Sequence, residues 1–170
     1  MTNADGSELT HLDGSGRARM VDVGAKRETE RAATARAVIA MRPDTLARIR
    51  GGTADKGDVL AVAQVAAVMA VKRTSDLIPL CHPLPVSAVD VRFAPDGDDR
   101  LAIEGSVRKF ARTGVEMEAL TGAAVGALAV YDMCKAIDRA MAVTFVGLLE
   151  KSGGQSGDYR RVRQEESGDG

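Results

Sequence analysis

The segment 59–73 carries apolar side chains around almost the whole circumference of an expected helix. They are Val59, Leu60, Val62, Val65, Val68, Met69 and Val71. A helix that is apolar on every side needs cover on every side, which predicts that this one is sandwiched between other elements. A chain of 170 residues with 45% hydrophobic content can build one compact domain around such a helix.

Four segments show the apolar and polar alternation that is typical of half-buried strands. Segment 29–41 places its apolar residues at odd positions, although its many alanines leave a helix as a competing interpretation. Segments 87–93 and 101–107 flank the turn residues 95–98 and predict a hairpin, and 143–149 is the last expected strand.

Two further helices are expected, over 45–50, where Gly51-Gly52 ends the helix, and over 119–137. The resulting order is strand, helix, helix, strand, strand, helix, strand. It predicts an α+β fold with helices packed on one face of an antiparallel sheet, close to a ferredoxin-like arrangement. We expect a single domain over residues 20–152, a mobile N-terminal segment over 1–19 and a flexible tail over 153–170.

Composition excludes several classes of function. The 23 basic and 24 acidic residues give a net charge of -1, which provides no field to gather nucleic acid or an anionic membrane. Aromatic residues are only 3%, too few for an RNA-stacking sheet. No membrane span or signal segment is visible, so a cytoplasmic protein is expected. Because the abundant small side chains bury little area each, the domain would gain from forming an oligomer.

A first polar cluster surrounds Cys81-His82, between Pro79 and Pro83. Prolines restrict the backbone on both sides, so His82 is presented with little freedom. Taken alone, the pattern favours a helix stop with a packed histidine. A zinc site is disfavoured, because Cys81, His82 and the distant Cys134 fall short of the ligands that zinc requires.

A second polar cluster begins with Glu116 and Glu118. The two carboxylates face the same side only if the segment is extended, whereas on a helix they diverge by roughly 200°. Paired carboxylates can act as general acid and base, or accept hydrogen bonds from a guanine-like ring. The alternative is that they only stabilise the positive end of the following helix.

Asp132 and Lys135 stand three residues apart within a helix of small residues, where we expect limited exposure. A partly buried lysine beside an aspartate can have its pKa tuned for proton transfer, although most such pairs are surface ion pairs. On a continuous helix Glu118 and Asp132 share a face but lie about 21 Å apart. We therefore expect an active site shared between subunits.

Lys56 precedes the apolar helix, where a lysine suits a phosphate group; the alternative is a solvated loop lysine. The same two interpretations apply to Lys72, Arg73, Arg108, Lys109 and Arg112.

Taken together these motifs closely resemble the molybdenum cofactor biosynthesis protein C family, cyclic pyranopterin monophosphate synthase. The matching segments are Met20-Val21-Asp22-Val23, Lys56-Gly57-Asp58, Lys72-Arg73-Thr74, 76–83, 113–121, 131–136 and Lys151-Ser152-Gly153-Gly154. They occur in unbroken order over roughly residues 9–158. Family members often carry a lysine where this chain has Gln155, which puts one peripheral phosphate contact in doubt.

The resemblance implies a ferredoxin-like hexamer, a trimer of dimers with sites at the dimer contact. It also implies conversion of 3',8-cyclo-7,8-dihydroguanosine 5'-triphosphate, supplied by a radical enzyme, to cyclic pyranopterin monophosphate and pyrophosphate, with no metal or other cofactor. The catalytic positions of the family fall on Lys56, Asp132 and Lys135. Its substrate-binding positions fall on Leu80, Cys81, His82, Glu116, Met117, Glu118 and Lys151.

Within this scheme we expect Asp132 and Lys135 to transfer protons, and Lys56, His82 and Lys151 to hold the triphosphate. A non-catalytic ligand-binding or regulatory module is the main alternative, because α+β sheets of this order often serve as binding domains.

Overall fold

The computed structural model describes residues 15, 17, 20–54, 56–154 and 157–162. Most of the predicted N-terminal segment, much of the predicted tail, and Gln155 lie outside these residues.

One antiparallel sheet forms the framework of the described chain. Its strands are β1 (Thr29–Ala40), β2 (Ala88–Pro95), β3 (Arg100–Ala111), β4 (Ala142–Ser152) and β5 (Tyr159–Arg160). They lie in the order β2-β3-β1-β4-β5, and each neighbouring pair is antiparallel. The alternation in segment 29–41 therefore belonged to a strand, and the predicted hairpin is β2–β3.

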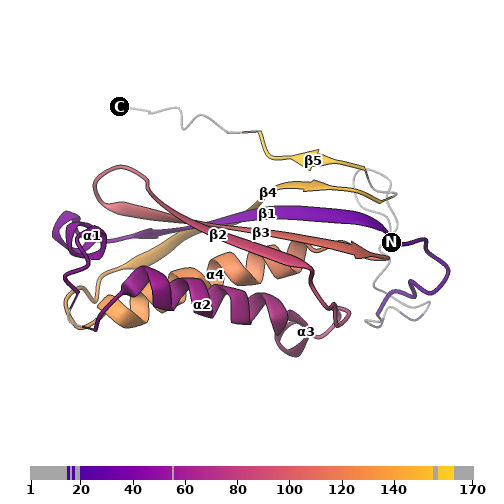
Figure 1. Cartoon of the computed structure of the whole chain (residues 1–170), viewed down its shortest axis with the longest axis horizontal. Coiled ribbons are helices and arrows are strands. Elements are labelled where there is room, and N and C mark those ends of the chain that lie inside the picture. Colours follow the sequence, from indigo (N-terminus) through magenta and orange to yellow (C-terminus); the bar gives the residue numbers. More distant parts are fainter. Residues whose placement is uncertain (1–14, 16, 18–19, 55, 155–156, 163–170) are drawn as a thin grey trace.

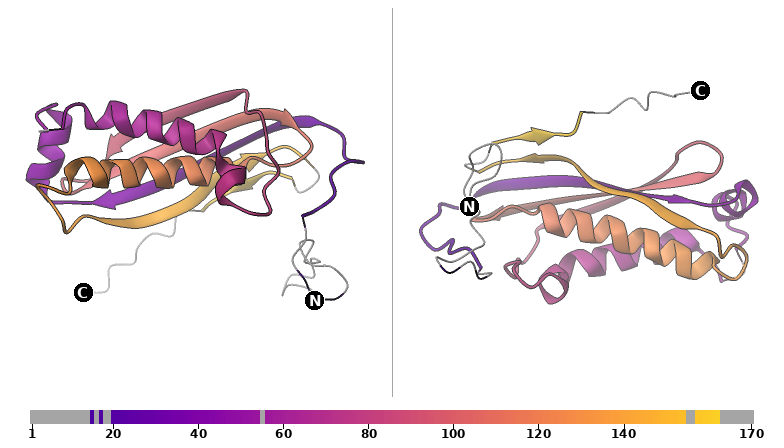
Figure 2. Two further views of the ribbon diagram at one scale, coloured as in Figure 1. Left: turned by 90° about the horizontal axis from the view of Figure 1, so that it is seen from below. Right: turned by 180° about the vertical axis from the view of Figure 1, so that it is seen from behind.

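The described residues also form four helices between the strands: α1 (Pro43–Arg50), α2 (Val59–Lys72), α3 (Thr74–Leu77) and α4 (Glu116–Cys134). The two long helices lie on one face of the sheet, whereas α1 lies at one end (Figure 1). Seen from below, α2 and α4 run side by side across that face (Figure 2). With the strand order β2-β3-β1-β4, this arrangement confirms the predicted ferredoxin-like α+β fold.

Local sequence signals account for the ends of the helices. Pro43 starts α1 at a position where a missing backbone N–H does no harm. Asp58 caps α2, because its side chain accepts a hydrogen bond from the Ala61 N–H at 3.0 Å. The structure also contains α3 and β5, which the sequence did not reveal because segments of four and two residues leave no periodic pattern.

Small residues along α4 allow close contact with the sheet and with α2. Its buried face is formed by Ala119, Gly122, Ala123, Gly126, Ala127 and Val130. A methyl group at Gly126 would lie 3.1 Å from Ile103 Cγ2 on β3, and one at Gly122 would lie 2.6 Å from Val71 Cγ2 on α2. The core of the domain therefore depends on the absence of side chains at these two positions.

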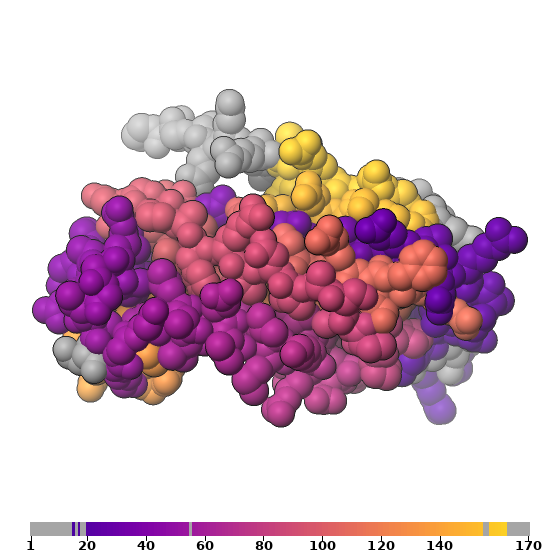
Figure 3. Space-filling model, in the orientation of Figure 1, coloured from indigo at the N-terminus to yellow at the C-terminus, as the bar shows by residue number. Residues whose placement is uncertain are grey.

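The prediction that α2 is sandwiched on all sides is wrong for the isolated chain. Val62, Val65 and Met69 are 45%, 59% and 48% exposed. The sheet and α4 can cover only part of the circumference of α2, and its surface is open along the lower edge of the face seen in Figure 3. The helix thus retains an apolar face that nothing within the described chain covers.

We predict that Gly122→Ala destabilises the fold by about 1–3 kcal/mol, because the added methyl group overpacks the contact with the buried, stiff Val71 side chain. Alanine alone would favour a helix by about 1 kcal/mol, so the sign of the change separates packing from propensity. The measurement is chemical denaturation. The double variant Gly122→Ala/Val71→Ala should lose less unfolding free energy than the sum of the losses in the two single variants. A Gly122→Ala protein that is more stable than the unchanged protein would contradict the close contact.

Candidate active site

A pocket of about 350 Å³ opens beside the first turn of α4. It contains six of the residues that the sequence singled out, namely Leu80, Cys81, His82, Glu116, Met117 and Glu118. Val21, Val23, Lys26, Leu84, Thr113 and Gly114 complete its lining. The two segments that the sequence treated as separate clusters, one after α3 and one at the start of α4, therefore form one concave site.

Glu118 is the buried acid of this pocket, with only 4% of its surface exposed. Burial raises its pKa, a hydrogen bond with its own backbone N–H lowers it, and the charge of Glu116 raises it; the pKa stays above the ordinary glutamate value. A carboxyl group with a raised pKa can hold or donate a proton closer to neutral pH than an exposed one.

Glu116 and Glu118 lie in the first helical turn, so they diverge around the axis rather than facing the same side. Glu116 pairs with Lys151 of β4, whose Nζ lies 2.9 Å from Oε1. Gly114 allows this geometry, because a methyl group there would overlap the Glu116 carboxylate. Lys151, the seventh predicted binding residue, thus reaches the pocket through Glu116.

The proline-rich segment is tied to the sheet by Lys109, whose Nζ donates to the Pro85 carbonyl. In the same segment, Cys81 lines the pocket together with the first residues of α4. Burial raises the pKa of the Cys81 thiol, and the charge of Glu118 raises it further. Cys81 is therefore kept as a neutral thiol, which suits contact with a substrate better than attack on one.

A basic hollow of about 1020 Å³ adjoins the pocket and shares Lys26, Thr113 and Gly114 with it. Arg27, Arg31 and Arg112 add positive charge. Within the described residues, the guanidinium of Arg31 donates only to the backbone carbonyls of Ala111, Arg112 and Gly153. The hollow is suited to an anionic group.

The predicted catalytic residues lie at the opposite end of α4. Lys56 Nζ donates to the Asp132 carbonyl at 3.0 Å, and Lys135 Nζ lies 2.7 Å from Asp132 Oδ1. Lys56 and Lys135 line a second pocket of about 380 Å³ with Tyr131, Ala136 and Arg139. Lys56 is therefore separated from His82 and Lys151, with which the sequence had grouped it.

The expected limited exposure of Asp132 and Lys135 is wrong for the isolated chain, because their side chains are 64% and 51% exposed. The small residues of α4 are buried on another face of the helix, whereas Leu128, Asp132 and Lys135 follow one another along an open face.

The electrostatics of this pair follow from its exposure. The hydrogen bond and charge of Lys135, with a further contribution from Lys56, lower the pKa of Asp132. The hydrogen bond and charge of Asp132 likewise raise the pKa of Lys135. Both groups are therefore held in their charged forms, and in the isolated chain neither is tuned toward neutral pH as the sequence suggested.

A comparison with known sequences decides the family, since the profile of the MoaC family matches residues 20–154, which include both pockets. The chain belongs to the MoaC family. It is 60% identical over 161 residues to "Cyclic pyranopterin monophosphate synthase 3" of Mycobacterium tuberculosis strain H37Rv, covering 95% of this chain and 90% of that protein.

Other MoaC-family relatives are similarly close. The chain is 57% identical to cyclic pyranopterin monophosphate synthase of Thermomicrobium roseum, over 94% of this chain and 96% of the relative. It is 55% identical to the protein of the same name from Brevibacillus brevis, over 91% and 96% respectively. The resemblance drawn from the motifs is thereby confirmed.

Sequence reasoning missed several of the residues that line these pockets. Val21 and Val23 were recognised only as part of a motif, and Lys26, Arg31 and Arg139 were not singled out. Basic residues in loops and strand ends have no distinctive pattern, so only their arrangement in space reveals them. Within the described residues, no three His, Cys, Asp or Glu side chains gather as metal ligands would, and no helix has the length and apolarity to cross a bilayer.

We predict that Glu118→Gln stabilises the protein at neutral pH. A raised pKa means that the favourable contribution of Glu118 is complete below the ordinary glutamate pKa and is lost as pH rises through the raised value. The free energy of unfolding of Glu118→Gln should therefore fall less than that of the unchanged protein between mildly acidic and neutral pH. Denaturation across this range is the measurement. Glu30→Gln, which removes an exposed carboxylate from β1, is the control, and identical pH dependence in both variants would contradict the prediction.

Proposed function

We propose that this chain is a cyclic pyranopterin monophosphate synthase, which converts 3',8-cyclo-7,8-dihydroguanosine 5'-triphosphate to cyclic pyranopterin monophosphate and pyrophosphate during molybdenum cofactor biosynthesis. The observation that carries the proposal is 55–60% identity, over nine-tenths or more of each chain, to relatives with that name. The two pockets supply the chemical detail.

The pocket beside the start of α4 suits the guanine-derived ring system. Glu116 and Glu118 offer acceptors for ring N–H groups, and Leu80, His82 and Met117 offer apolar and aromatic contact. Rearranging the ring needs proton transfers, and the raised pKa of Glu118 suits it to exchange a proton with a ring nitrogen.

The adjoining basic hollow suits the triphosphate. Lys26, Arg27, Arg31 and Arg112 surround it, and guanidinium groups can bind phosphate oxygens in pairs. Positive charge here also stabilises pyrophosphate as it leaves. Lys151 adds a further cation next to Glu116.

Asp132 and Lys135 supply a proton-transfer pair in this proposal. The low pKa of Asp132 keeps it as a carboxylate, the form that accepts a proton, and the raised pKa of Lys135 keeps it as an ammonium, the form that donates one. Removing water from the pair would shift both groups toward their neutral forms, since desolvation disfavours charge. A second subunit that covers this exposed pair would thus bring it closer to proton transfer.

A site completed by two subunits accounts for the distance between the pockets. One substrate cannot contact both ends of α4 in one chain, because Glu118 and Asp132 are about 21 Å apart along the helix. In our proposal the Glu118 end of one chain meets the Lys135 end of its neighbour, within a homohexamer built as a trimer of dimers. The apolar face of Val62, Val65 and Met69 supports an oligomer, since its burial would stabilise one. We place the enzyme in the cytoplasm, downstream of the radical enzyme that supplies its substrate.

We predict that Asp132→Ala and Lys56→Ala each lower kcat by about 100-fold or more, because each removes a group assigned to proton transfer or to charge stabilisation. The assay incubates the protein with the cyclic dihydroguanosine triphosphate and measures pyrophosphate and the oxidised pterin product. Asp90→Ala, which removes an exposed carboxylate from β2, is the control and should keep full activity. Ligand binding without either product in the unchanged protein would favour the binding-module alternative, and loss of binding rather than turnover in Asp132→Ala would contradict its catalytic role.

We predict that two inactive variants with changes at opposite ends of α4 restore activity when mixed. After co-refolding, His82→Ala with Lys135→Ala should reach about a quarter of full activity, since half of random dimers are mixed and each has one intact site. Lys56→Ala with Lys135→Ala, both at one end, is the matched control and should stay inactive. Equal recovery in both mixtures, or full turnover by a monomer at high dilution, would contradict a shared site.

A further inference from the structure

Asp138 is a buried carboxylate that lines neither the pocket beside the start of α4 nor the pocket of Lys56 and Lys135 at its other end. Only 3% of its surface is exposed, and it follows Lys135 by three residues, in the turn between α4 and β4. Buried carboxylates are rare unless their oxygens are fully engaged, so its contacts indicate what it does.

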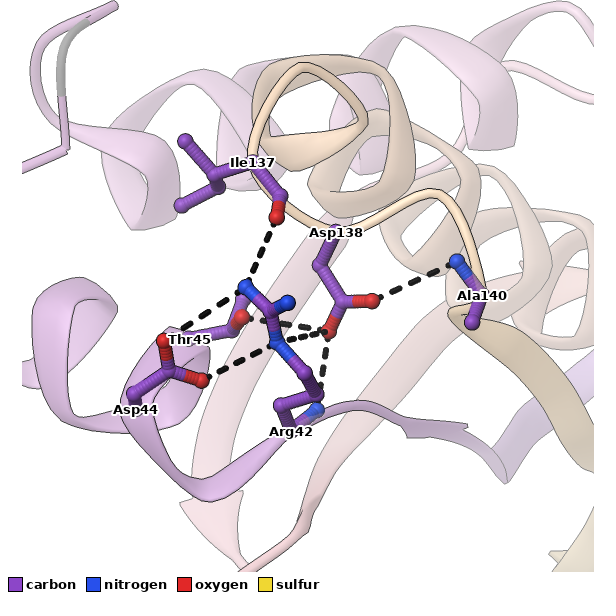
Figure 4. Close-up of polar contacts among 6 residues, drawn as sticks. All are labelled: Arg42, Asp44, Thr45, Ile137, Asp138 and Ala140. Atoms are coloured by element: carbon purple, nitrogen blue, oxygen red, sulfur yellow. Dashed lines mark hydrogen bonds and ion pairs between the residues drawn. The ribbon is translucent and has the colours of Figure 1, made fainter.

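The Asp138 side chain joins this turn to the start of α1 (Figure 4). Its Oδ2 accepts hydrogen bonds from the Arg42 backbone N–H at 2.8 Å and the Thr45 hydroxyl at 3.1 Å. Its Oδ1 accepts one from the Ala140 N–H at 3.3 Å, on the turn itself. One carboxylate therefore connects two elements that are more than 90 residues apart in the sequence.

These contacts keep Asp138 charged in spite of its burial. Burial alone would raise its pKa, but the hydrogen bonds from Arg42 N–H and Thr45, the guanidinium charge of Arg42 and the Ala140 N–H lower the pKa below the ordinary value. Hydrogen bonds to an ionised acceptor are stronger than those between neutral groups. The charged Asp138 therefore holds the turn strongly to the start of α1.

The turn is held by these outside contacts in addition to its own backbone hydrogen bonds, from the Ile137 and Asp138 N–H groups to the Cys134 carbonyl. Helices commonly end with a glycine in the left-handed conformation, but the chain has no glycine between Gly126 and Gly147. Lys135 at the end of α4 keeps right-handed helical angles, φ -58° and ψ -21°. Further hydrogen bonds come from Arg42 Nη2 to the Ile137 carbonyl, 2.7 Å, and from the Tyr131 hydroxyl to the Arg139 carbonyl, 3.4 Å.

The same short turn presents the cations of the second pocket. Lys135 precedes Asp138 and Arg139 follows it directly, and both line that pocket with Lys56. A displacement of the turn would move Lys135 relative to Asp132, which lies on the regular part of α4 and keeps its place.

We propose that Asp138 is a positioning residue: its carboxylate anchors the α4–β4 turn to α1 and thereby holds Lys135 in register with Asp132 and Lys56. This inference rests on the proposed function only in assigning Lys135 to catalysis. A displacement of about 1 Å at a reacting group can lower a rate by about 100-fold, so an anchor that touches no substrate can still control turnover.

Asp138→Ala removes the anchor, because it deletes the acceptor for the two hydrogen bonds from the start of α1 and for the one from the Ala140 N–H. We expect kcat to fall by about tenfold to 100-fold with little change in KM. Asp138→Asn is the matched control, because its amide oxygen can replace Oδ2 and keep both bonds to α1, while the Ala140 N–H faces an amide group that cannot accept it. Asp138→Asn should recover most of the kcat that is lost in Asp138→Ala.

A second measurement does not need activity. The titration of Asp132, followed by NMR of its carboxyl carbon, reports how close Lys135 lies. In Asp138→Ala the pKa of Asp132 should rise toward its ordinary value, and in Asp138→Asn it should change much less. Should Asp138→Ala fail to fold, Arg42→Leu removes an exposed side chain and its bond to Ile137, and should raise the Asp132 pKa in the same direction.

An unchanged Asp132 titration and kcat in Asp138→Ala, or equal losses in Asp138→Ala and Asp138→Asn, would overturn the positioning role. A further check is Lys135→Ala, in which Asp138→Ala should have no additional effect on the residual rate, because a residue that acts through Lys135 has nothing left to position. If Lys135→Ala keeps full activity while Asp138→Ala still shifts the Asp132 titration, the catalytic assignment of Lys135 fails and the anchor stands.

Discussion

The close packing of α4 against β3 and α2 determines where every other part of the site can lie. Gly126 brings the helix within a methyl group of Ile103, and Gly105 of β3 faces the Ala119 carbonyl, where an added methyl group would lie 3.3 Å away. With so little space on either side, α4 is held as one continuous helix of 19 residues. Its two ends are therefore at a fixed separation, and each end carries its own set of functional side chains.

The two ends of α4 differ in their electrostatics because one end is buried and the other is open to solvent. Glu118 is enclosed by the loop after α3, so loss of solvation dominates and its pKa is raised. Asp132 and Lys135 are open to solvent, so their mutual attraction dominates and both remain charged. A site that joins these two environments would combine an acid that protonates readily with a charged pair, which suits a reaction with several proton transfers and an anionic leaving group.

The anchored α4–β4 turn connects the packed core to the exposed end of α4, which carries Asp132 and Lys135. Asp138 and Arg42 connect β1 and α1 to a turn that contains no glycine. Lys135, whose side chain is 51% exposed and pairs with Asp132, is thus attached to a segment that the core holds in place.

By itself, the sequence determined the four longer strands, the three longer helices, the antiparallel α+β fold and the family. Alternation in 29–41, the Asp58 cap and the ordered motifs around Cys81 and Glu116 are local signals, which do not need distant parts of the chain. Only the tertiary structure decided that Cys81-His82 and Glu118 share a pocket, that Asp132 and Lys135 are exposed, and that Asp138 bonds to Arg42. Burial and pKa depend on which distant elements pack over a side chain, and the local sequence around a residue does not indicate which elements these are.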